Sequence, residues 1–258
     1  MQIYKTIKAG PLCRVVVYPK LSWKDKRQRG PRRALTSKAQ EKLNLKSSFE
    51  KLEALIACNF SRGFWWVTLT YRDADLPETR AAALNVFGKK FMPKLRKHWR
   101  SHGTEIREIH CTQQVQSDGS LRLHHHMILN RCGPDDFDVI RSLWTWCDPI
   151  GVEVKWCSGR DQITDKAHYM THEPREHGKL EKGKQTWSCS KNLEHPVVEE
   201  VEVPDDVQPA APYGADVVDM DSVRNEYGAY HYLKYWLPDR TGPDKNLASG
   251  EVLTFDAT

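Results

Sequence analysis

The sequence predicts an α+β fold: an antiparallel sheet of the ferredoxin-like or RNA-recognition-like (RRM-like) kind, with helices on one face. Two observations support this prediction. Strand and helix patterns follow one another in the order β-α-β-β-α-β, with a final helix, which is the order that such a sheet requires. Hydrophobic residues make up 39% of the 258 residues, which is enough for one sizeable core.

The first half of this predicted domain contains two helices and one buried strand. Apolar residues recur at three- and four-residue steps from 34 to 58, which predicts a helix. Residues 64–71 (FWWVTLTY) are mainly aromatic and β-branched, as in a buried strand. Residues 75–100 are predicted to form a long helix, because their large apolar side chains lie along one face.

A β-hairpin follows in the second half. Strands at 105–116 and 121–130 flank Asp118 and Gly119, and Asp-Gly between two strand patterns is a strong hairpin signal. The remaining predicted elements are a helix at 134–147, a short strand at 152–156 and a helix at 161–172.

Changes in composition set the predicted domain boundaries. Residues 1–60 are predicted to be a basic N-terminal arm and a helix, and residues 61–194 form the domain itself. Residues 195–225 are acidic and contain prolines, as a linker does. The C-terminal extension, residues 226–258, begins with an aromatic segment that we expect to dock on the domain.

The charges are distributed unevenly along the chain. Residues 1–50 contain thirteen Lys or Arg against three Asp or Glu, although the net charge of the whole chain is only +5. This asymmetry favours a polyanionic partner for the N-terminal part, and a solvated basic arm without a partner is the alternative.

The cysteines and the apolar runs bear on the compartment. Seven scattered cysteines without a CxxC pair argue against a disulfide framework and indicate a reducing cytoplasm. No apolar run has the length that a membrane helix needs, and the N-terminus lacks the apolar stretch of a secretory signal. We therefore expect a cytoplasmic protein without a membrane partner.

Three consecutive histidines carry the most informative pattern in the sequence. Because side chains alternate between the faces of a strand, His124 and His126 point one way and His125 points the other. Two imidazoles on one face can bind a cation if a neighbouring strand supplies a further ligand. Gln114 is the predicted third ligand, and this ligand set suits Mn²⁺ and tolerates Mg²⁺. A histidine pair without metal and an adventitious zinc site are the alternatives.

A tyrosine about 45 residues after the histidines is the candidate nucleophile. A helix that continues to Pro174 would place Tyr169 and His172 on one face. A phenol there can attack a phosphorus atom and become attached to the 5′ side of the cut, while a cation stabilises the charge on the phosphate. Lys166, one turn before Tyr169, could add positive charge. A structural tyrosine is the alternative.

These segments, in this order, resemble the three motifs of rolling-circle replication initiators (Rep proteins) of the HUH endonuclease superfamily, of the bacterial plasmid and phage type. FWWVTLTYRD resembles the first motif, a hydrophobic strand that ends in Leu-Thr-like residues. LRLHHHMILN resembles the second, His-hydrophobic-His, and HYMTHEPRE resembles the third, Tyr-x-x-Lys. The resemblance covers roughly residues 64–193.

The resemblance implies a site-specific DNA endonuclease and strand transferase that starts rolling-circle replication through a 5′-phosphotyrosine and a divalent metal, Mn²⁺ or Mg²⁺. It also implies a bacterial host that supplies a polymerase and, because the sequence has no GxxxxGK[ST] loop, a helicase. Two alternatives remain: a non-catalytic single-stranded nucleic-acid-binding protein on an RRM-like sheet, and a metal-dependent phosphodiesterase that uses water.

Three residues depart from the pattern of the family. His125 stands where relatives usually have a bulky apolar residue, so it either faces the core or takes part in function. Gln114 stands where the third ligand is often Glu, and its neutral oxygen would bind a cation less tightly. His172 replaces the lysine of the third motif, and its charge would fade as the pH rises above about 6.5.

Single-stranded DNA requires cations for its backbone and aromatic faces for its bases. The predicted DNA-binding residues lie in the basic segment and on the long helix: Trp23, Lys24, Lys26, Arg27, Arg29, Arg32, Arg33, Lys90 and Lys94. A solvated face is the alternative for the helix lysines. Tyr230 and Tyr232 are rival nucleophiles, because Lys234 lies close to them in the sequence.

Overall fold

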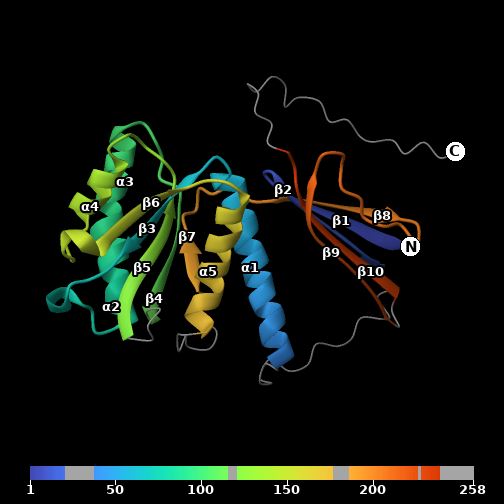
Figure 1. Ribbon diagram of the computed structural model, residues 1–258, viewed down its shortest axis with the longest axis horizontal. Helices are drawn as coiled ribbons and strands as arrows, with labels where there is room; N and C mark the ends of the chain where they lie inside the picture. Colours follow the sequence, from blue (N-terminus) through green and yellow to red (C-terminus); the bar gives the residue numbers. More distant parts are fainter. Residues whose placement is uncertain (21–37, 116–120, 177–185, 226–227, 239–258) are drawn as a thin grey trace.

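The computed structural model describes residues 1–20, 38–115, 121–176, 186–225 and 228–238, which form two five-stranded antiparallel sheets (Figure 1). We call one of them the central sheet. Its strands, in spatial order, are β6 (Val152–Cys157), β3 (Phe64–Leu69), β5 (Leu121–Leu129), β4 (Glu108–Val115) and β7 (Trp187–Cys189). The predicted α+β class and the antiparallel β4–β5 pairing are confirmed.

Helices cover both faces of the central sheet, which corrects the expectation that they lie on one face (Figure 1). One face packs against α1 (Lys38–Phe60) and α5 (Arg160–Glu176). The other packs against α2 (Arg80–Asn85), the π-helical segment η3 (Val86–Phe91), α3 (Met92–Ser101) and α4 (Asp136–Leu143). The cause lies in β3 and β5, where Trp66 and Ile128 are buried on one face and Val67 and Met127 on the other. A strand that is apolar on both faces needs cover on both.

The predicted long helix at 75–100 is divided into several pieces. A 3₁₀ turn, η2 (Asp73–Asp75), precedes α2, and the π-helical η3 separates α2 from α3. Pro93 stands in the first turn of α3 and has no backbone N–H, so it interrupts the α-helical hydrogen bonds at this point. A second 3₁₀ turn, η4 (Pro149–Gly151), leads into β6.

The second sheet, which we call the terminal sheet, is built from both ends of the chain. Its strands, in spatial order, are β8 (Val197–Val203), β1 (Gln2–Ala9), β2 (Leu12–Pro19), β10 (Gly228–Trp236) and β9 (Asp216–Asn225). Two domain predictions are therefore corrected. Residues 1–20 are strands rather than part of a basic arm, and the expected acidic linker at 195–225 contains β8 and β9.

Charge complementarity explains this pairing. Lys5 contacts Glu200 at 2.7 Å and Lys8 contacts Glu199 at 2.9 Å across the β1–β8 edge. Basic residues near the N-terminus and acidic residues near 200 thus neutralise each other within one sheet. The charge asymmetry of the sequence is in part an internal feature of the fold, and it does not all serve an external partner.

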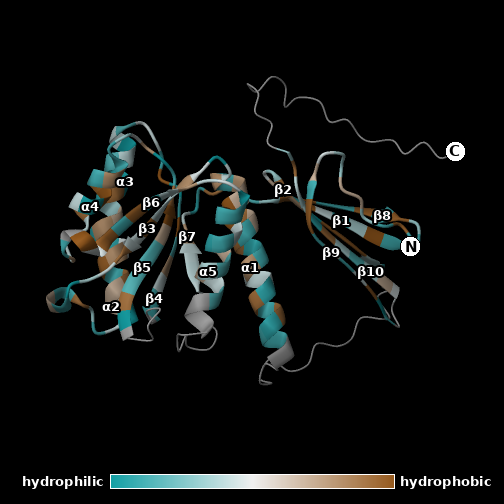
Figure 2. Cartoon of the chain, in the orientation of Figure 1, coloured by the Kyte–Doolittle hydropathy of each residue, from teal (hydrophilic) through white to brown (hydrophobic). Residues whose placement is uncertain are grey.

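Helix α1 joins the two sheets. In Figure 1 it lies between α5 and the terminal sheet, and in Figure 2 hydrophobic and hydrophilic residues alternate along it. Leu12 and Trp236 of the terminal sheet are buried in the same apolar cluster as α1. Glu53 of α1 forms a buried ion pair with Lys234 of β10 at 2.7 Å. Among the described helices, none has the length and apolar character needed to cross a membrane.

Candidate metal and nucleophile site

Two histidines of β5 lie on the face of the central sheet that α5 covers. His124 and His126 point to this same side, as the alternation of a strand predicts, and their ring centroids lie 4.9 Å apart. The rings are nearly perpendicular, at 88°. Both residues are buried, with 6% and 5% of their surface exposed. The strand therefore presents two imidazoles to one small, dry region.

Gln113, rather than the predicted Gln114, faces these histidines. The β4–β5 register places Gln113 directly opposite His124, and the Gln113 Oε1 atom lies 3.1 Å from His124 Nε2. Directly opposed residues of antiparallel strands share a face, so the next residue along must point away. The side chain of Gln114 is accordingly exposed. The predicted third ligand is thus corrected by one position.

The hydrogen bonds of His124 indicate which of its nitrogens can bind a cation. Its Nδ1 atom lies 2.9 Å from the carbonyl oxygen of Arg122, and only an N–H can donate to a carbonyl. The lone pair is therefore on Nε2, where it faces Gln113 Oε1, which is also an acceptor. Burial lowers the pKa of both His124 and His126, which favours the neutral form that binds metals. This set of donors fits a divalent cation held by two imidazoles and an amide oxygen.

Tyr169 brings a hydroxyl group to the same point. Its Oη atom lies 3.1 Å from His126 Nε2 and 3.3 Å from Gln113 Oε1. The tyrosine ring packs edge-on against the rings of Trp66 and His126, at centroid distances of 5.7 and 4.9 Å. It is half-buried on α5. Rigid neighbours from two strands thus hold the phenol against the histidine pair.

Lys166 approaches this cluster from one turn earlier in α5. Its ammonium group lies 5.1 Å from the centroid of the Trp66 ring, the same ring against which Tyr169 packs. It also forms an ion pair with Asp165 at 2.7 Å. The positive charge of Lys166 contributes to lowering the pKa of His126. The predicted role of Lys166 as a source of positive charge is therefore compatible with its position.

His172 packs toward α1. It stacks on His168 at a centroid distance of 3.8 Å, with the planes 9° apart, and both rings meet Phe49 of α1 edge-on. The predicted spacing of His172 three residues after Tyr169 is present in α5, but these ring contacts are with α1 rather than with the sheet that carries the histidine pair. Lys166 is therefore the better-placed cation for the lysine role of the third motif.

His125 points to the opposite face of the sheet, where it is fully buried. Its two ring nitrogens lie 2.7 Å from the Tyr71 hydroxyl and 2.8 Å from the Thr112 hydroxyl, and its ring stacks on Phe87. Of the two interpretations left open for this residue, the structure shows the one in which it faces the core. Both of its ring nitrogens have partners there, as a buried imidazole requires.

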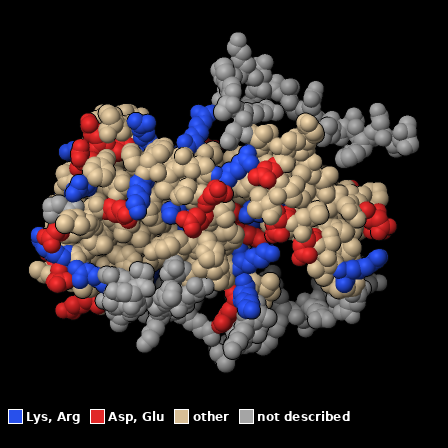
Figure 3. Space-filling model, in the orientation of Figure 1, with Lys and Arg blue, Asp and Glu red and all other residues tan. Residues whose placement is uncertain are grey.

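The predicted DNA-binding residues fall into two groups. Trp23, Lys24, Lys26, Arg27, Arg29, Arg32 and Arg33 lie outside the described residues. Lys90 and Lys94 are exposed, on η3 and α3, and these helices cover the face of the sheet away from His124 and His126. Figure 3 shows basic and acidic side chains interspersed on the face in view. The position of Lys90 and Lys94 does not link them to the histidine pair.

The rival nucleophiles lie in the other sheet. Tyr230 and Tyr232 belong to β10, so the fold separates them from the histidines of β5. Tyr232 is half-buried, with the Lys46 ammonium 5.2 Å from the centroid of its ring. Burial raises the pKa of Tyr232, which makes its phenolate harder to form.

Sequence reasoning missed three neighbours of the histidine pair: Gln113, Trp66 and Thr68. The Trp66 ring stacks on His126 at 5.0 Å, and the Thr68 hydroxyl lies 3.2 Å from His126 Nδ1. The first predicted motif contains both residues of β3, and their two-residue spacing places them on one face. What the sequence lacked was the register that sets Thr68 opposite His126.

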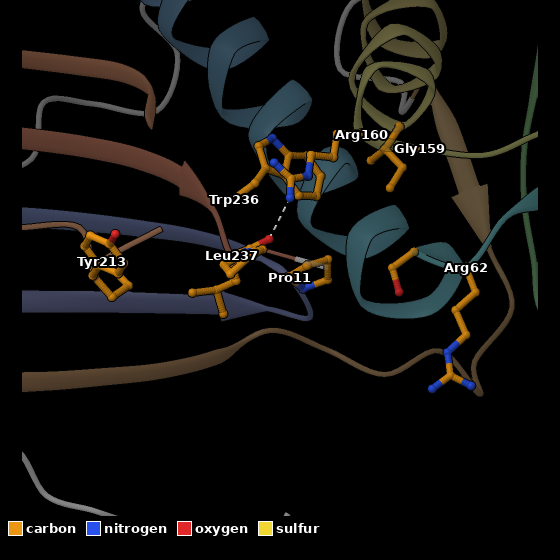
Figure 4. Close-up of a pocket in the computed structure, with 11 residues that line it drawn as sticks. Pro11, Arg62, Gly159, Arg160, Tyr213, Trp236 and Leu237 are labelled. Carbon is orange, nitrogen blue, oxygen red and sulfur yellow. Dashed lines mark hydrogen bonds between the residues drawn. The ribbon is translucent and has the colours of Figure 1, made fainter. Parts of the chain in front are cut away.

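A separate pocket of about 690 Å³ lies where the start of α5 meets the terminal sheet (Figure 4). Arg62, Arg160, Tyr213 and Trp236 are among its lining residues. Arg160 donates a hydrogen bond to the Leu237 carbonyl oxygen at 2.8 Å. Neither histidine of the pair lines this pocket, so it is distinct from the site of Tyr169.

Comparison with known protein families found a match for the middle of the chain. Residues 64–183 match the model of a family of replication-associated proteins, described as the ORF2 type. This confirms the resemblance to rolling-circle replication initiators that the three motifs predict. The matched segment includes the histidine pair, Gln113 and Tyr169. The searches of curated proteins and of solved structures found no match.

Proposed function

We propose, from the premise that residues 64–183 match a replication-associated family, that this protein nicks and rejoins single-stranded DNA at a replication origin and so initiates rolling-circle replication. One observation carries the proposal. The Tyr169 hydroxyl lies within hydrogen-bonding distance of both His126 Nε2 and Gln113 Oε1. A nucleophile and a candidate cation site thus occupy the same place on the sheet.

His124, His126 and Gln113 are the residues that would hold the metal, with Mn²⁺ or Mg²⁺ as the expected ion. When bound, a divalent cation supplies a Lewis acid that withdraws charge from a phosphate oxygen. Thr68 and the Arg122 carbonyl hold the outer nitrogens of the two imidazoles. Such outer contacts fix the orientation and tautomer of metal-binding histidines.

Tyr169 is the proposed nucleophile. Its oxygen forms a bond to phosphorus while the bond from phosphorus to the 3′ oxygen of the neighbouring nucleotide breaks. The phenol loses its proton and the departing 3′ oxygen gains one, so no net charge is created. Lys166 stabilises the developing phenolate by its charge, and Trp66 limits the motion of the tyrosine ring.

The proposed intermediate explains the joining step. The 5′ end of the DNA stays bonded to Tyr169 as a phosphodiester, which conserves the energy of the broken bond. A 3′-hydroxyl that later enters the site can attack the same phosphorus and release the tyrosine. The reaction is therefore reversible without an external energy source.

The test is covalent capture. The protein is incubated with Mn²⁺ and a pool of randomised single strands labelled at the 3′ end, and the products are separated on a denaturing gel. We expect a labelled protein adduct that Tyr169→Phe abolishes and that Tyr232→Phe, the matched change in the terminal sheet, retains. Cleavage without an adduct would indicate a phosphodiesterase that uses water. Binding without cleavage would indicate a non-catalytic binding protein.

The grip on DNA remains a prediction for the basic segment. Replacing Arg29, Arg32 and Arg33 together by Ala should weaken DNA binding and reduce its dependence on salt concentration, because fewer phosphate charges are neutralised. Cleavage at saturating DNA should persist. Unchanged affinity at low salt would remove this segment from the DNA interface. A host helicase and polymerase remain the predicted partners.

A further inference from the structure

A second cluster of metal-binding side chain types lies away from the histidine pair, at the C-terminal end of α3. It consists of His98 and His102 in the last turns of the helix and Cys132 in the segment after β5. One ligand atom from each residue lies within 4.8 Å of the other two. We propose that this cluster binds Zn²⁺ through two imidazoles and a thiolate, with water as a fourth ligand.

The helix brings the two imidazoles together. Residues four apart on a helix are neighbours on one face, and the ring centroids of His98 and His102 lie 4.3 Å apart. The Nδ1 atom of His102 lies 3.0 Å from the carbonyl oxygen of His98, so this nitrogen carries the hydrogen. Nε2 of His102 therefore keeps the lone pair that a metal needs. The same carbonyl contact fixes the ring, as outer contacts do in known metal sites.

The electrostatic surroundings favour a cation. The last turn of α3 directs its free carbonyl groups, the negative end of the helix dipole, toward the cluster. Asp136 is buried and accepts hydrogen bonds from the backbone N–H groups of Cys132 and Gly133, each at 2.9 Å. Burial and the charge of Asp136 raise the pKa of Cys132, so the free thiol stays protonated at neutral pH. Zinc binding would form the Zn–S bond and release the thiol proton to solvent.

The chemistry of the donors distinguishes this cluster from the histidine pair. A thiolate with two imidazoles selects Zn²⁺ over Mn²⁺ or Mg²⁺, whereas two imidazoles with an amide oxygen do not. The position suggests what zinc would do. The Trp99 indole already donates to the carbonyl oxygen of Asn130, at 3.3 Å, which ties α3 to the end of β5. A zinc ion between α3 and Cys132 would reinforce this link close to the strand that carries His124 and His126.

The test uses Co²⁺ as a spectroscopic substitute for zinc on the full chain, stripped of metal with a chelator and without DNA. We expect one equivalent of Co²⁺ to produce a sulfur-to-cobalt charge-transfer band, and one equivalent of Zn²⁺ to remove it. Cys132→Ser should abolish the band, and Cys147→Ser, another half-buried cysteine, should retain it. Because the band reports a sulfur ligand, the outcome does not depend on the proposed nicking activity.

A second variant guards against misfolding of the first. His102 is exposed, so His102→Ala should fold normally, as circular dichroism can check, and should weaken Zn²⁺ binding at least about tenfold. Zinc should also raise the melting temperature of the wild-type protein and not that of His102→Ala. The absence of a sulfur band, or a band that survives Cys132→Ser, would overturn the proposal.

Discussion

The central and terminal sheets have the same number of strands and the same antiparallel pairing, yet they differ in what surrounds them. Helices cover both faces of the central sheet, whereas β8 and β9 of the terminal sheet are exposed along nearly their whole length. The central sheet buries three consecutive histidines and Gln113. At the edge of the terminal sheet, Lys5 and Glu200 form an ion pair in contact with solvent.

This difference shows where chemistry can develop on a sheet. In the central sheet, burial excludes competing water, lowers the histidine pKa values and holds lone pairs in fixed directions. In the terminal sheet, solvent screens the charges and weakens their effect. Strand number and pairing are equal, so the helical cover is the feature that accounts for the difference.

The largest expected effect separates the two sheets by activity. His126→Ala should reduce DNA cleavage by on the order of 10²–10³-fold or abolish it, because charge on the phosphate would no longer be stabilised. The matched change is His231→Ala on β10, a strand histidine of the terminal sheet that contacts the Ser222 hydroxyl at 2.8 Å. It should leave cleavage unchanged. DNA affinity should stay within about tenfold in both variants. Normal cutting by His126→Ala would refute the metal assignment.

The next effect concerns the connection between the sheets. Lys234→Met should lower the free energy of unfolding by about 3–5 kcal/mol, because it leaves the carboxylate of Glu53 buried without its cation. Thr164 donates to the same carboxylate at 2.9 Å and cannot replace the charge. Urea unfolding measures the loss.

A double variant provides the control for this ion pair. Glu53→Leu combined with Lys234→Met removes both charges and should recover most of the stability, since two apolar side chains can pack in the same space. If Lys234→Met alone is as stable as the wild type, the ion pair does not hold the terminal sheet to α1.

The smallest effect is expected at the solvent-exposed edge of the terminal sheet. Lys5→Ala removes the partner of Glu200 and should change the free energy of unfolding by less than about 1 kcal/mol. The same urea experiment applies, repeated at high salt, where the difference should shrink further. A loss as large as that of Lys234→Met would show that the solvent-exposed pairs are as important as the buried one.

Local pattern was enough to predict much of the central sheet. The strand at 64–71 corresponds to β3, the two hairpin strands to β4 and β5, and the last predicted helix to α5. The common direction of His124 and His126 follows from the two-residue period of a strand, and Tyr169 was correctly placed on a helix. Each of these features depends only on residues that are close together in the chain.

Features that depend on distant residues needed the tertiary structure. Gln113 rather than Gln114 faces the histidines because the register between two strands decides it, and no pattern within β4 contains that information. The terminal sheet escaped prediction for the same reason, because β1 pairs with a strand nearly two hundred residues later, in a segment whose acidic composition resembles a linker.

The sequence by itself therefore determined the periodic elements and the candidate chemical groups: two imidazoles on one face of a strand and a phenol on a helix. Only the tertiary structure decided which groups meet, namely Gln113 with His124, Lys166 with Trp66, and His172 with α1. The physical reason is that backbone periodicity is a local property, whereas the distance between two side chains from different elements is set by packing and strand register.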